Sequence, residues 1–468
     1  MIAAVIALGI VVGDGASLRA APKDSAPLSA PLAPGDALEL RGERAGFLQV
    51  YDHRRERGGY VRRAAVRELG SAPEDAPGLL AVVRFLRDTP GEESVGIGYV
   101  AAYLRAAPAN AIGAEAFDAL GGFAERLGRH ASRRSDKPDD PKLALQLDAA
   151  QAYGVRFASI EREGRVELCY DGEAYRRVLA QSPTAEQAAH AALGLTRSEC
   201  VDPDLTPPAR LELDRWRADV LGRVDAAALP AWLAGKVHIR RAAVSAALAY
   251  SEERGGDAAA AKIAGEKALS ELALANPVEL ADDDQGAYAD AAARVGASRW
   301  ASESSASRTG GLVLQTHPGE AGETCLRVAR AKTPEQPLVE RCTHALVWTA
   351  SARSAPHDSA LAVAVQPTDS WRELWIFRET SQGWVADVLT PAAADPGVGY
   401  VELAGFTPDG KHVLTAREAR AGGHKEREFA LLDLETLAVE KKADHPEAIT
   451  AFARWQSAEW KATTVAIR

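Results

Sequence analysis

Short runs of alternating apolar and polar residues occupy the beginning of the chain. The segments 37–40 (ALEL), 47–51 (FLQVY) and 59–62 (GYVR) alternate in this way, and residues such as Gly, Pro and Asp separate them. This pattern is typical of β-strands joined by tight turns. Because successive side chains of a strand point to opposite faces, one apolar set should share an interior. We expect a small β-barrel whose inner face is formed by Leu38, Leu40, Leu48, Val50 and Val61.

The pattern changes to the period of a helix between residues 79 and 301. Ala, Leu, Arg and Glu dominate there, and apolar residues recur three and four positions apart, as in 114–131 (AEAFDALGGFAERLGRHA). We expect an α-helical domain, either a bundle or a set of irregular helical repeats, because no motif recurs at the roughly 34-residue period of tetratricopeptide repeats. One alternating stretch, 155–170, predicts a β-hairpin that turns at Glu163-Gly164.

Strand-like alternation returns from residue 312 onward. The segments 359–390 and 406–443 each predict a strand, a polar loop, a strand, a turn and a strand. Pro-, Ser- or Gly-rich stretches at 71–78 and 302–311 predict linkers. The chain is therefore expected to be a multidomain α+β protein, with a small SH3-like β-barrel, an α-helical middle domain and a C-terminal antiparallel β-sheet domain at residues 10–70, 79–301 and 312–468.

The first of these regions resembles a bacterial SH3-like (SH3b) domain over residues 10–68. The matches to the opening, turn, central strand and closing strand of that family are Leu18-Arg19 with Pro22, Gly35-Asp36, Phe47-Leu48-Gln49-Val50 and Gly59-Tyr60-Val61. SH3b domains are small β-barrels that act as binding or targeting modules at the cell envelope, so the resemblance implies such a role here. Within the barrel we expect Gly58-Gly59 to supply the positive φ of a tight hairpin.

Residues 312–468 resemble the blades of TolB-like and WD40-like propellers. The resemblance lies in Phe406-Thr407-Pro408-Asp409-Gly410-Lys411, which is similar to the turn motif of such blades. In those families the turn reverses the chain and the aromatic residue packs between blades. A closed propeller needs about four or more blades of roughly 40 to 50 residues each. We therefore expect propeller-blade-like units in a β-sheet that does not close.

Charge and cysteine usage exclude several classes of protein. The net charge of −10 opposes nucleic-acid binding, which requires a concentrated excess of Lys and Arg. None of the four cysteines lies in a CxxC pair, which argues against a zinc ribbon or a thioredoxin-like motif. In an oxidising compartment we expect two local disulfides, Cys169–Cys200 and Cys325–Cys342; in a reducing cytosol these would be four buried thiols.

The N-terminal run 2–12 is apolar but too short to cross a bilayer. Two interpretations stay open: residues 1–9 are the remnant of a signal peptide, or residues 9–12 form the first barrel strand. No later segment has the roughly 18 uninterrupted apolar residues of a membrane helix, so no transmembrane span is expected. The predicted location is the periplasm or another exported site, or the cytoplasm if the N-terminus is not a signal remnant.

Catalytic, metal and cofactor motifs are missing from the sequence. There is no G-x-S-x-G elbow, no H-E-x-x-H pair and no Walker motif. The run 96–101 mimics part of a dinucleotide fingerprint, but no strand precedes it. We expect a protein without enzymatic activity, cofactor or metal. Trp371 and Trp375 share a face of a predicted strand and should fill the β-domain core, with an exposed aromatic shelf as the alternative.

The candidate ligand-binding residues lie on the SH3-like module, where basic and aromatic side chains gather around one hairpin. The basic ones also fit a solvated hairpin tip, and the aromatic ones also fit barrel packing. These residues are Tyr51, His53, Arg54, Arg55, Arg57 and Tyr60.

From these features we expect a cell-envelope binding or scaffold protein that engages peptidoglycan or an envelope protein or peptide. Two alternatives stay open. One is a cell-wall hydrolase, or another envelope enzyme, with the SH3b module as its targeting arm. The other is a helical-repeat adaptor that binds a partner protein through the middle domain.

Overall fold

Two compact units make up the chain in the computed structural model. The first comprises Met1–Leu205 and the second Thr206–Arg468. The division falls inside the segment 79–301, which the helical pattern predicts as one domain, so the helices belong to both units. The structure describes residues 7–133, 141–162, 164–303, 307–392, 397–421 and 424–463.

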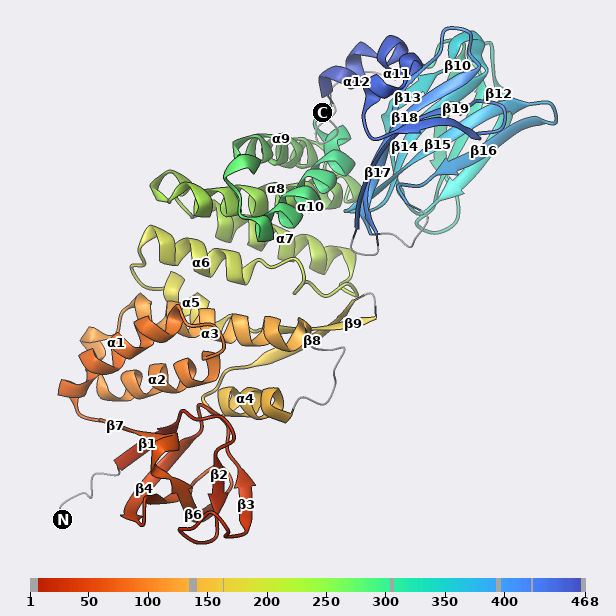
Figure 1. Ribbon diagram of the computed structural model, residues 1–468. Helices are drawn as coiled ribbons and strands as arrows, with labels where there is room; N and C mark the ends of the chain where they lie inside the picture. Colours follow the sequence, from red (N-terminus) through yellow and green to blue (C-terminus); the bar gives the residue numbers. More distant parts are fainter. Residues whose placement is uncertain are drawn as a thin grey trace. The chain divides into compact units, whose positions relative to one another are not determined.

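A seven-stranded antiparallel sheet begins the first unit (Figure 1). Its order is β3-β2-β6-β5-β4-β1-β7, an open path with β3 and β7 at the edges, so the sheet does not close into a barrel. The proposed signal remnant 1–9 lies mostly outside the described residues, and β1 begins at Ala7. The strands are β1 (Ala7–Val11), β2 (Ser17–Arg19), β3 (Leu28–Pro31), β4 (Ala37–Arg44), β5 (Phe47–Asp52), β6 (Arg57–Arg62) and β7 (Val66–Leu69).

The interior of this sheet contains the apolar face predicted from the alternating pattern. Leu38, Leu48, Val50 and Val61 are buried in one cluster, and Leu40 packs against it while partly exposed. The two-residue period of the strands therefore assigns the inner and outer faces correctly. The alternating pattern does not determine whether the sheet closes into a barrel.

The hairpin between β5 and β6 differs from the prediction. The positive φ belongs to Glu56, at 52°, and not to Gly58 or Gly59, which lie within β6 and pair with Tyr51 and Val50. The carboxylate of Asp52 accepts hydrogen bonds from the amides of residues 54 and 55 and so stabilises the turn. Gly59 has a different role, because a Cβ there would lie 2.7 Å from Leu18 Cγ.

Helices and one hairpin complete the first unit. The hairpin predicted at 155–170 is present: β8 pairs with β9, and Gly164 has a φ of 71°. In α3, Phe123 and Leu127 recur four residues apart and are fully buried in a cluster that also contains Ile10 of β1. The elements are α1 (Ala76–Arg87), α2 (Glu93–Ala106), α3 (Ala114–Arg133), α4 (Pro141–Ala152), β8 (Phe157–Arg162), β9 (Arg165–Tyr170), α5 (Glu173–Leu179) and α6 (Ala185–Leu195).

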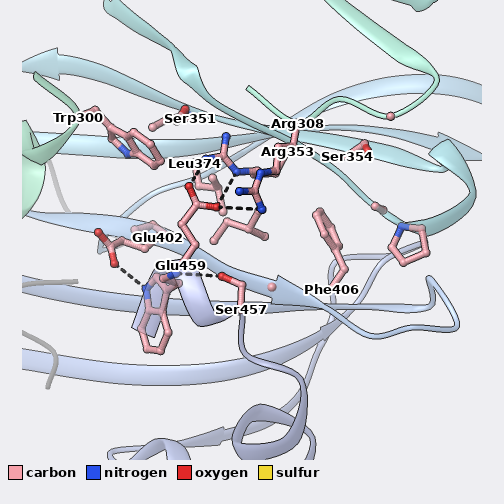
Figure 2. A pocket seen from close by; sticks show the side chains of 18 of the residues that line it. Trp300, Arg308, Ser351, Arg353, Ser354, Leu374, Glu402, Phe406, Ser457 and Glu459 are labelled. Carbon is pink, nitrogen blue, oxygen red and sulfur yellow. Dashed lines mark hydrogen bonds and ion pairs between the residues drawn. The ribbon is translucent and has the colours of Figure 1, made fainter. Parts of the chain in front are cut away.

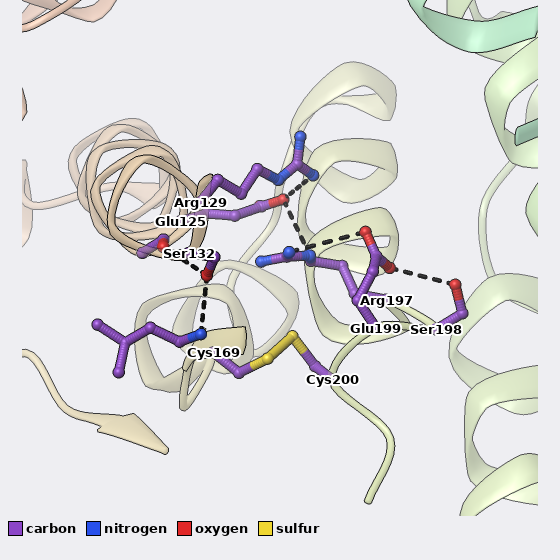
Figure 3. The surroundings of a disulfide bond; sticks show 10 residues. Glu125, Arg129, Ser132, Cys169, Arg197, Ser198, Glu199 and Cys200 are labelled. Carbon is purple, nitrogen blue, oxygen red and sulfur yellow. Dashed lines mark hydrogen bonds and ion pairs between the residues drawn. A yellow bond between two sulfur atoms is a disulfide. The ribbon is translucent and has the colours of Figure 1, made fainter. Parts of the chain in front are cut away.

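A disulfide joins β9 to the segment that follows α6 (Figure 3). Cys169 and Cys200 are bonded across a sequence separation of 31, as predicted. Next to Cys169, the amide of Leu168 donates to Ser132 Oγ at 2.8 Å, which attaches the strand to α3. A disulfide therefore joins the hairpin to the segment after α6, and a hydrogen bond joins it to α3.

Four helices begin the second unit. The apolar residues of α8, α9 and α10 pack together; Ala242, Ala246, Ala268 and Val295 are among the buried ones. Small alanine side chains allow these helices to approach closely. Their bounds are α7 (Pro207–Gly222), α8 (Ala231–Arg254), α9 (Ala258–Leu274) and α10 (Asp282–Ser298), followed by the one-turn helix η6 (Arg299–Ala301).

Two sheets form the rest of the second unit (Figure 1). One is the three-stranded sheet β10-β11-β12. The other runs β13-β14-β15-β17-β18-β19-β20, with β16 also paired to β15. The strands are β10 (Leu312–Pro318), β11 (Thr324–Arg330), β12 (Thr333–Thr343), β13 (Leu346–Ser354), β14 (Ala360–Thr368), β15 (Trp371–Thr380), β16 (Gly383–Leu389), β17 (Val398–Phe406), β18 (His412–Ala421), β19 (His424–Asp433) and β20 (Val439–Ala443).

The larger sheet is continuous and does not divide into separate blades. Its pairing is antiparallel except between β15 and β17, which run parallel where Trp371 and Arg372 meet Gly399 and Tyr400. The turn at 406–411 does reverse the chain between β17 and β18. In it, Asp409 Oδ1 accepts from the amide of residue 411. At the end of the sheet, β20 is an edge strand whose residues 439–442 are exposed.

Both faces of β14 and β15 are buried. On one face, Val363 and Phe377 pack against Leu326 of the three-stranded sheet. On the other face, Ala362 and Leu374 belong to a cluster that includes residues of β17, β18 and β19. Strands covered on both sides are rich in apolar residues, as the sequence 360–365 is.

The predictions for aromatic and cysteine residues hold in this unit. Trp371 and Trp375 are 2% and 4% exposed, so they fill the core and do not form a surface shelf. Cys325 and Cys342 face each other on β11 and β12 and form the second predicted disulfide. Two short helices, α11 (Thr450–Trp455) and α12 (Ala458–Thr463), follow the last strand.

Candidate functional site

Two of the basic residues predicted to bind a ligand on the first sheet, Arg54 and Arg55, form ion pairs with buried carboxylates. Arg54 Nη2 lies 2.9 Å from Asp36 Oδ1, and Arg55 Nη1 lies 3.1 Å from Asp36 Oδ2 and 2.6 Å from Asp52 Oδ2. Both carboxylates are buried. Burial raises the pKa of Asp36 above its ordinary value, although both arginines oppose this shift. These contacts attach the β5–β6 hairpin to the turn before β4.

The other predicted residues also have contacts within the first sheet. His53 Nε2 lies 2.7 Å from Glu39 Oε2, and the Tyr51 ring packs edge-on against His53 at 4.9 Å. Arg57 donates to the carbonyl of residue 29 at 2.9 Å, and Tyr60 pairs with Gln49 and Arg19 across β5 and β2. The structure thus brings the six predicted residues together on one hairpin, while their polar groups are used mainly inside the module.

The candidate site that the structure offers is a pocket in the second unit, with a volume of about 530 Å³ (Figure 2). It lies beside β13, β15 and β17, and α12, η6 and the turn η7 (Pro356–Asp358) contribute to its wall. The wall combines apolar and arginine side chains. The lining includes Arg299, Trp300, Arg308, Ser351, Arg353, Ser354, His357, Asp358, Arg372, Leu374, Glu402, Phe406, Ser457, Glu459 and Trp460.

The buried part of the pocket wall contains a carboxylate between two arginines. Glu402 Oε1 lies 2.5 Å from Arg299 Nε and 2.9 Å from Arg372 Nη2, while Trp460 Nε1 donates to Oε2 at 2.6 Å. Arg372 is completely buried and donates Nη1 to the carbonyl of Gly296. Burial lowers the pKa of Arg372 to about 10, so its guanidinium stays charged at neutral pH.

The outer part of the pocket contains a second pair of arginines around one carboxylate. Arg353 Nη2 lies 2.5 Å from Glu459 Oε1, and Figure 2 shows the two groups facing each other. Arg308 Nη1 is 3.9 Å from the other oxygen of Glu459, and its side chain is 74% exposed. The Trp300 ring stacks near Arg299 and Arg353, with guanidinium carbons 4.4 and 5.6 Å from the ring centroid.

Two consecutive residues of η7 have left-handed backbone conformations. His357 and Asp358 have φ values of 63° and 56°. Non-glycine residues adopt this region at an energetic cost, and such residues concentrate at ligand clamps and active sites. The amide of Gly311 donates to Asp358 Oδ1 at 2.9 Å and helps to hold the turn. The pocket therefore has a strained and anchored rim.

Serine and histidine residues lie in the pocket without the contacts of a catalytic triad. Ser351 Oγ donates to the carbonyl of Trp348, and Ser457 Oγ accepts from the amide of Trp460. Across the described parts of the chain, no serine forms a hydrogen bond with a histidine ring. Nucleophilic catalysis requires a base within reach of the nucleophile.

Two groups of potential metal ligands occur near the second disulfide. One combines His317, Cys325 and Glu340, and the other combines Glu323, Cys325 and Cys342. Both depend on cysteines whose sulfurs are bonded to each other, whereas a metal ligand requires a thiolate. Neither group is therefore suited to hold a metal in the oxidised protein.

No protein-family model, curated protein or solved structure matches this chain. Within the residues that the structure describes, no helix is both long and apolar enough to span a bilayer.

Sequence reasoning did not find this pocket. Its arginines are spread over about 75 residues of sequence, from η6 to β15, and no motif contains them. One signal was present: strand alternation puts Arg372 on the same face as the apolar Leu374 and Ile376. A charged residue at such a position requires a buried partner. The sequence does not reveal that the partner is Glu402.

Proposed function

We propose that the protein is an exported binding protein of the cell envelope without enzymatic activity, and that it holds a ligand in the pocket of the second unit. The observation that carries the proposal is the composition of the pocket wall. Ligand sites are concave, mostly apolar and contain a few convergent polar groups. Leu374 and Phe406 provide apolar surface beside Arg308 and Arg353, in a cavity of about 530 Å³.

Export is supported by the two disulfides. Disulfides persist in oxidising compartments and are rare in the cytosol. The disulfides Cys169–Cys200 and Cys325–Cys342 include all four cysteines of the chain, so none is a free thiol. A location in the periplasm, or at another exported site, agrees with this usage.

The first sheet is proposed to be an SH3-like module, partly open instead of a closed barrel, that engages peptidoglycan or an envelope protein. The support is its own apolar cluster and the exposure of His53, Arg54 and Arg57 at one hairpin. The internal ion pairs of Arg54 and Arg55 make this surface a weaker candidate than the pocket. Neither the hydrolase nor the helical-repeat adaptor gains support from a specific contact.

A thermal-shift screen of the full chain tests the proposed function. The screen uses small acidic, neutral and basic organic compounds and compares the protein with the variant Ser354→Trp. Ser354 lines the pocket, so an indole there should fill it. We expect at least one class of compound to raise the melting temperature of the protein and to lose this effect in the variant.

The matched control is Ser381→Trp, which places the same side chain on the exposed β15–β16 turn. This variant should respond to compounds as the unchanged protein does. Two results would refute a ligand site here: no compound of any class raises the melting temperature, or Ser354→Trp retains the full response.

A further inference from the structure

The outer arginine pair of the pocket has more positive than negative charge. Arg308 and Arg353 share the single carboxylate of Glu459. Over the whole lining, four arginines stand against the carboxylates of Asp358, Glu402 and Glu459, which leaves one positive charge in the pocket. Arg353 is largely occupied, because it also donates Nη1 to the carbonyls of residues 350 and 352. Arg308 is 3.9 Å from Glu459, beyond hydrogen-bond distance, and is exposed, so its donors are open to a ligand.

Apolar and aromatic side chains line the same pocket. Figure 2 shows Trp300, Leu374 and Phe406 around the cavity with Arg308 and Arg353 nearby. Leu374 is buried, and Trp300 and Phe406 are half-buried. These side chains can pack on the apolar body of a ligand whose charged end lies at Arg308.

Two further observations indicate a site organised for an acceptor ligand. The Nε of Arg372 is fully buried and has no hydrogen-bond partner among the described residues, although the other donors of this guanidinium are used. The rim contains the strained pair His357 and Asp358. Strain of this kind persists only where the surroundings hold it, and it recurs at ligand clamps.

The excess positive charge of the pocket favours a carboxylate over a phosphate as the ligand group. A carboxylate carries one negative charge and matches the planar fork of a guanidinium. A phosphate monoester carries about −1.5 to −2 at pH 7, which exceeds the single positive charge left among the residues that line the pocket. A monoanionic planar group is therefore the better electrostatic match.

Building on the proposed binding function, we propose that the pocket binds an organic monocarboxylate with an apolar body. Arg308 holds the carboxylate, Arg353 adds positive charge beside it, and Trp300, Leu374 and Phe406 pack on the body. The probes are N-acetylphenylalanine and decanoate, titrated into the full chain by calorimetry. N-acetylphenylalaninamide serves as the uncharged comparison and phenyl phosphate as the dianion. At least one acid should bind saturably and about tenfold or more tightly than the amide and the phosphate, since hydrogen bonds to charged groups are the stronger ones.

Arg308→Gln provides the test of the residue assignment. It should weaken binding of the acid about tenfold and leave binding of the amide unchanged, because only the charged contact is lost. The matched control is Arg330→Gln. Arg330 is also an exposed arginine of the second unit and lies 3.9 Å from one carboxylate, that of Glu379, but it is outside the pocket. It should leave both affinities as they are.

Several outcomes would overturn the monocarboxylate assignment. These are failure of both acids to bind, equal affinity for acid and amide, tighter binding of phenyl phosphate, or no effect of Arg308→Gln. The proposed binding function would survive each of them if compounds of another charge class stabilise the protein and lose this effect in Ser354→Trp. The two proposals can therefore fail separately.

Discussion

Glu402 is the residue on which the buried part of the pocket depends. Its carboxylate contacts Arg299, Arg372 and the indole of Trp460, which come from three separate elements. Without the carboxylate of Glu402, the buried guanidinium groups of Arg299 and Arg372 would repel each other, and neither could become solvated. Removal of one partner from a buried ion pair costs more than the pair itself contributes, because a charge is left uncompensated.

We therefore expect Glu402→Gln to destabilise the second unit by about 3–5 kcal/mol. All the tryptophans lie between residues 216 and 460, so tryptophan fluorescence during urea unfolding reports on this unit. The midpoint should move to lower urea while the slope of the transition stays constant.

Glu340→Gln is the surface control for this substitution. Glu340 contacts Arg327 at 2.7 Å, but both side chains are about one-third exposed. Solvent screens such a pair, so its loss should shift the midpoint little. Equal shifts for the two variants would contradict a structural role specific to the buried carboxylate.

Individual contacts of this kind were the least accessible to sequence reasoning. The two disulfides could be paired from spacing alone, because each pair falls within one predicted region. In contrast, Arg299 and Glu402 are 103 residues apart, and nothing in either local sequence indicates the other. Long-range polar partners depend on how sheets and helices are packed.

At the scale of elements, a partly buried hydrogen bond connects the helical layer of the first unit to its sheet. Tyr153, just after α4, donates its hydroxyl to the carbonyl of Gly35 at 2.7 Å. The turn at Gly35 has little space, since a Cβ there would lie 2.5 Å from the carbonyl oxygen of Ser94 in α2. Burial raises the pKa of Tyr153 to about 12.

Tyr153→Phe should lower the stability of the first unit by about 1 kcal/mol at neutral pH, because a buried acceptor loses its donor. The folded pKa of Tyr153 lies above its ordinary value of 10.0. The advantage of tyrosine over phenylalanine is therefore complete below pH 10 and disappears as the pH rises toward about 12. Hydrogen exchange of peptides from the first unit measures this difference across the pH range.

Tyr51→Phe provides the comparison, because the Tyr51 ring packs against His53 and Arg41 through its face and edge. It should leave the stability of the first unit nearly unchanged at neutral pH. The assignment of the effect to the contact with Gly35 would be wrong if the two variants behaved alike.

Periodicity predicted elements well when their partners were local. The hairpin at 155–170 and the inner face of the first sheet follow from alternation alone, since neighbouring strands impose the register. Closure of the first sheet did not follow, because it depends on whether β3 and β7 meet, and no local pattern encodes that. The same limit applies to the division of the second β region into blades.

At the scale of the whole molecule, each unit contains its own core and its own disulfide. Cys169–Cys200 lies within the first unit and Cys325–Cys342 within the second, and no disulfide joins the two units. The composition of the chain predicts more than one domain but does not predict where the two units divide. It placed the change of pattern near residue 301, whereas the boundary between the units lies at 205–206, within the helical segment. Helices on both sides of that boundary have the same composition, so no composition shift marks it.

The double variant Cys169→Ala/Cys200→Ala should destabilise the first unit alone. Loss of a cross-link that closes a loop of about 31 residues costs roughly 3–4 kcal/mol. Far-ultraviolet circular dichroism should then show an earlier unfolding phase, while the tryptophan fluorescence transition of the second unit stays in place. The pair Cys325→Ala/Cys342→Ala should have the opposite pattern. A common shift of both signals in both variants would mean that the units unfold together.

The exposed edge strand β20 has a consequence for encounters between copies of the chain. Its unpaired backbone groups could accept a further strand, as the growing end of a fibril does. Lys441 and Lys442 occupy this edge. Lysines on an exposed edge strand disfavour pairing with a further strand, so this edge is protected from stacking into filaments.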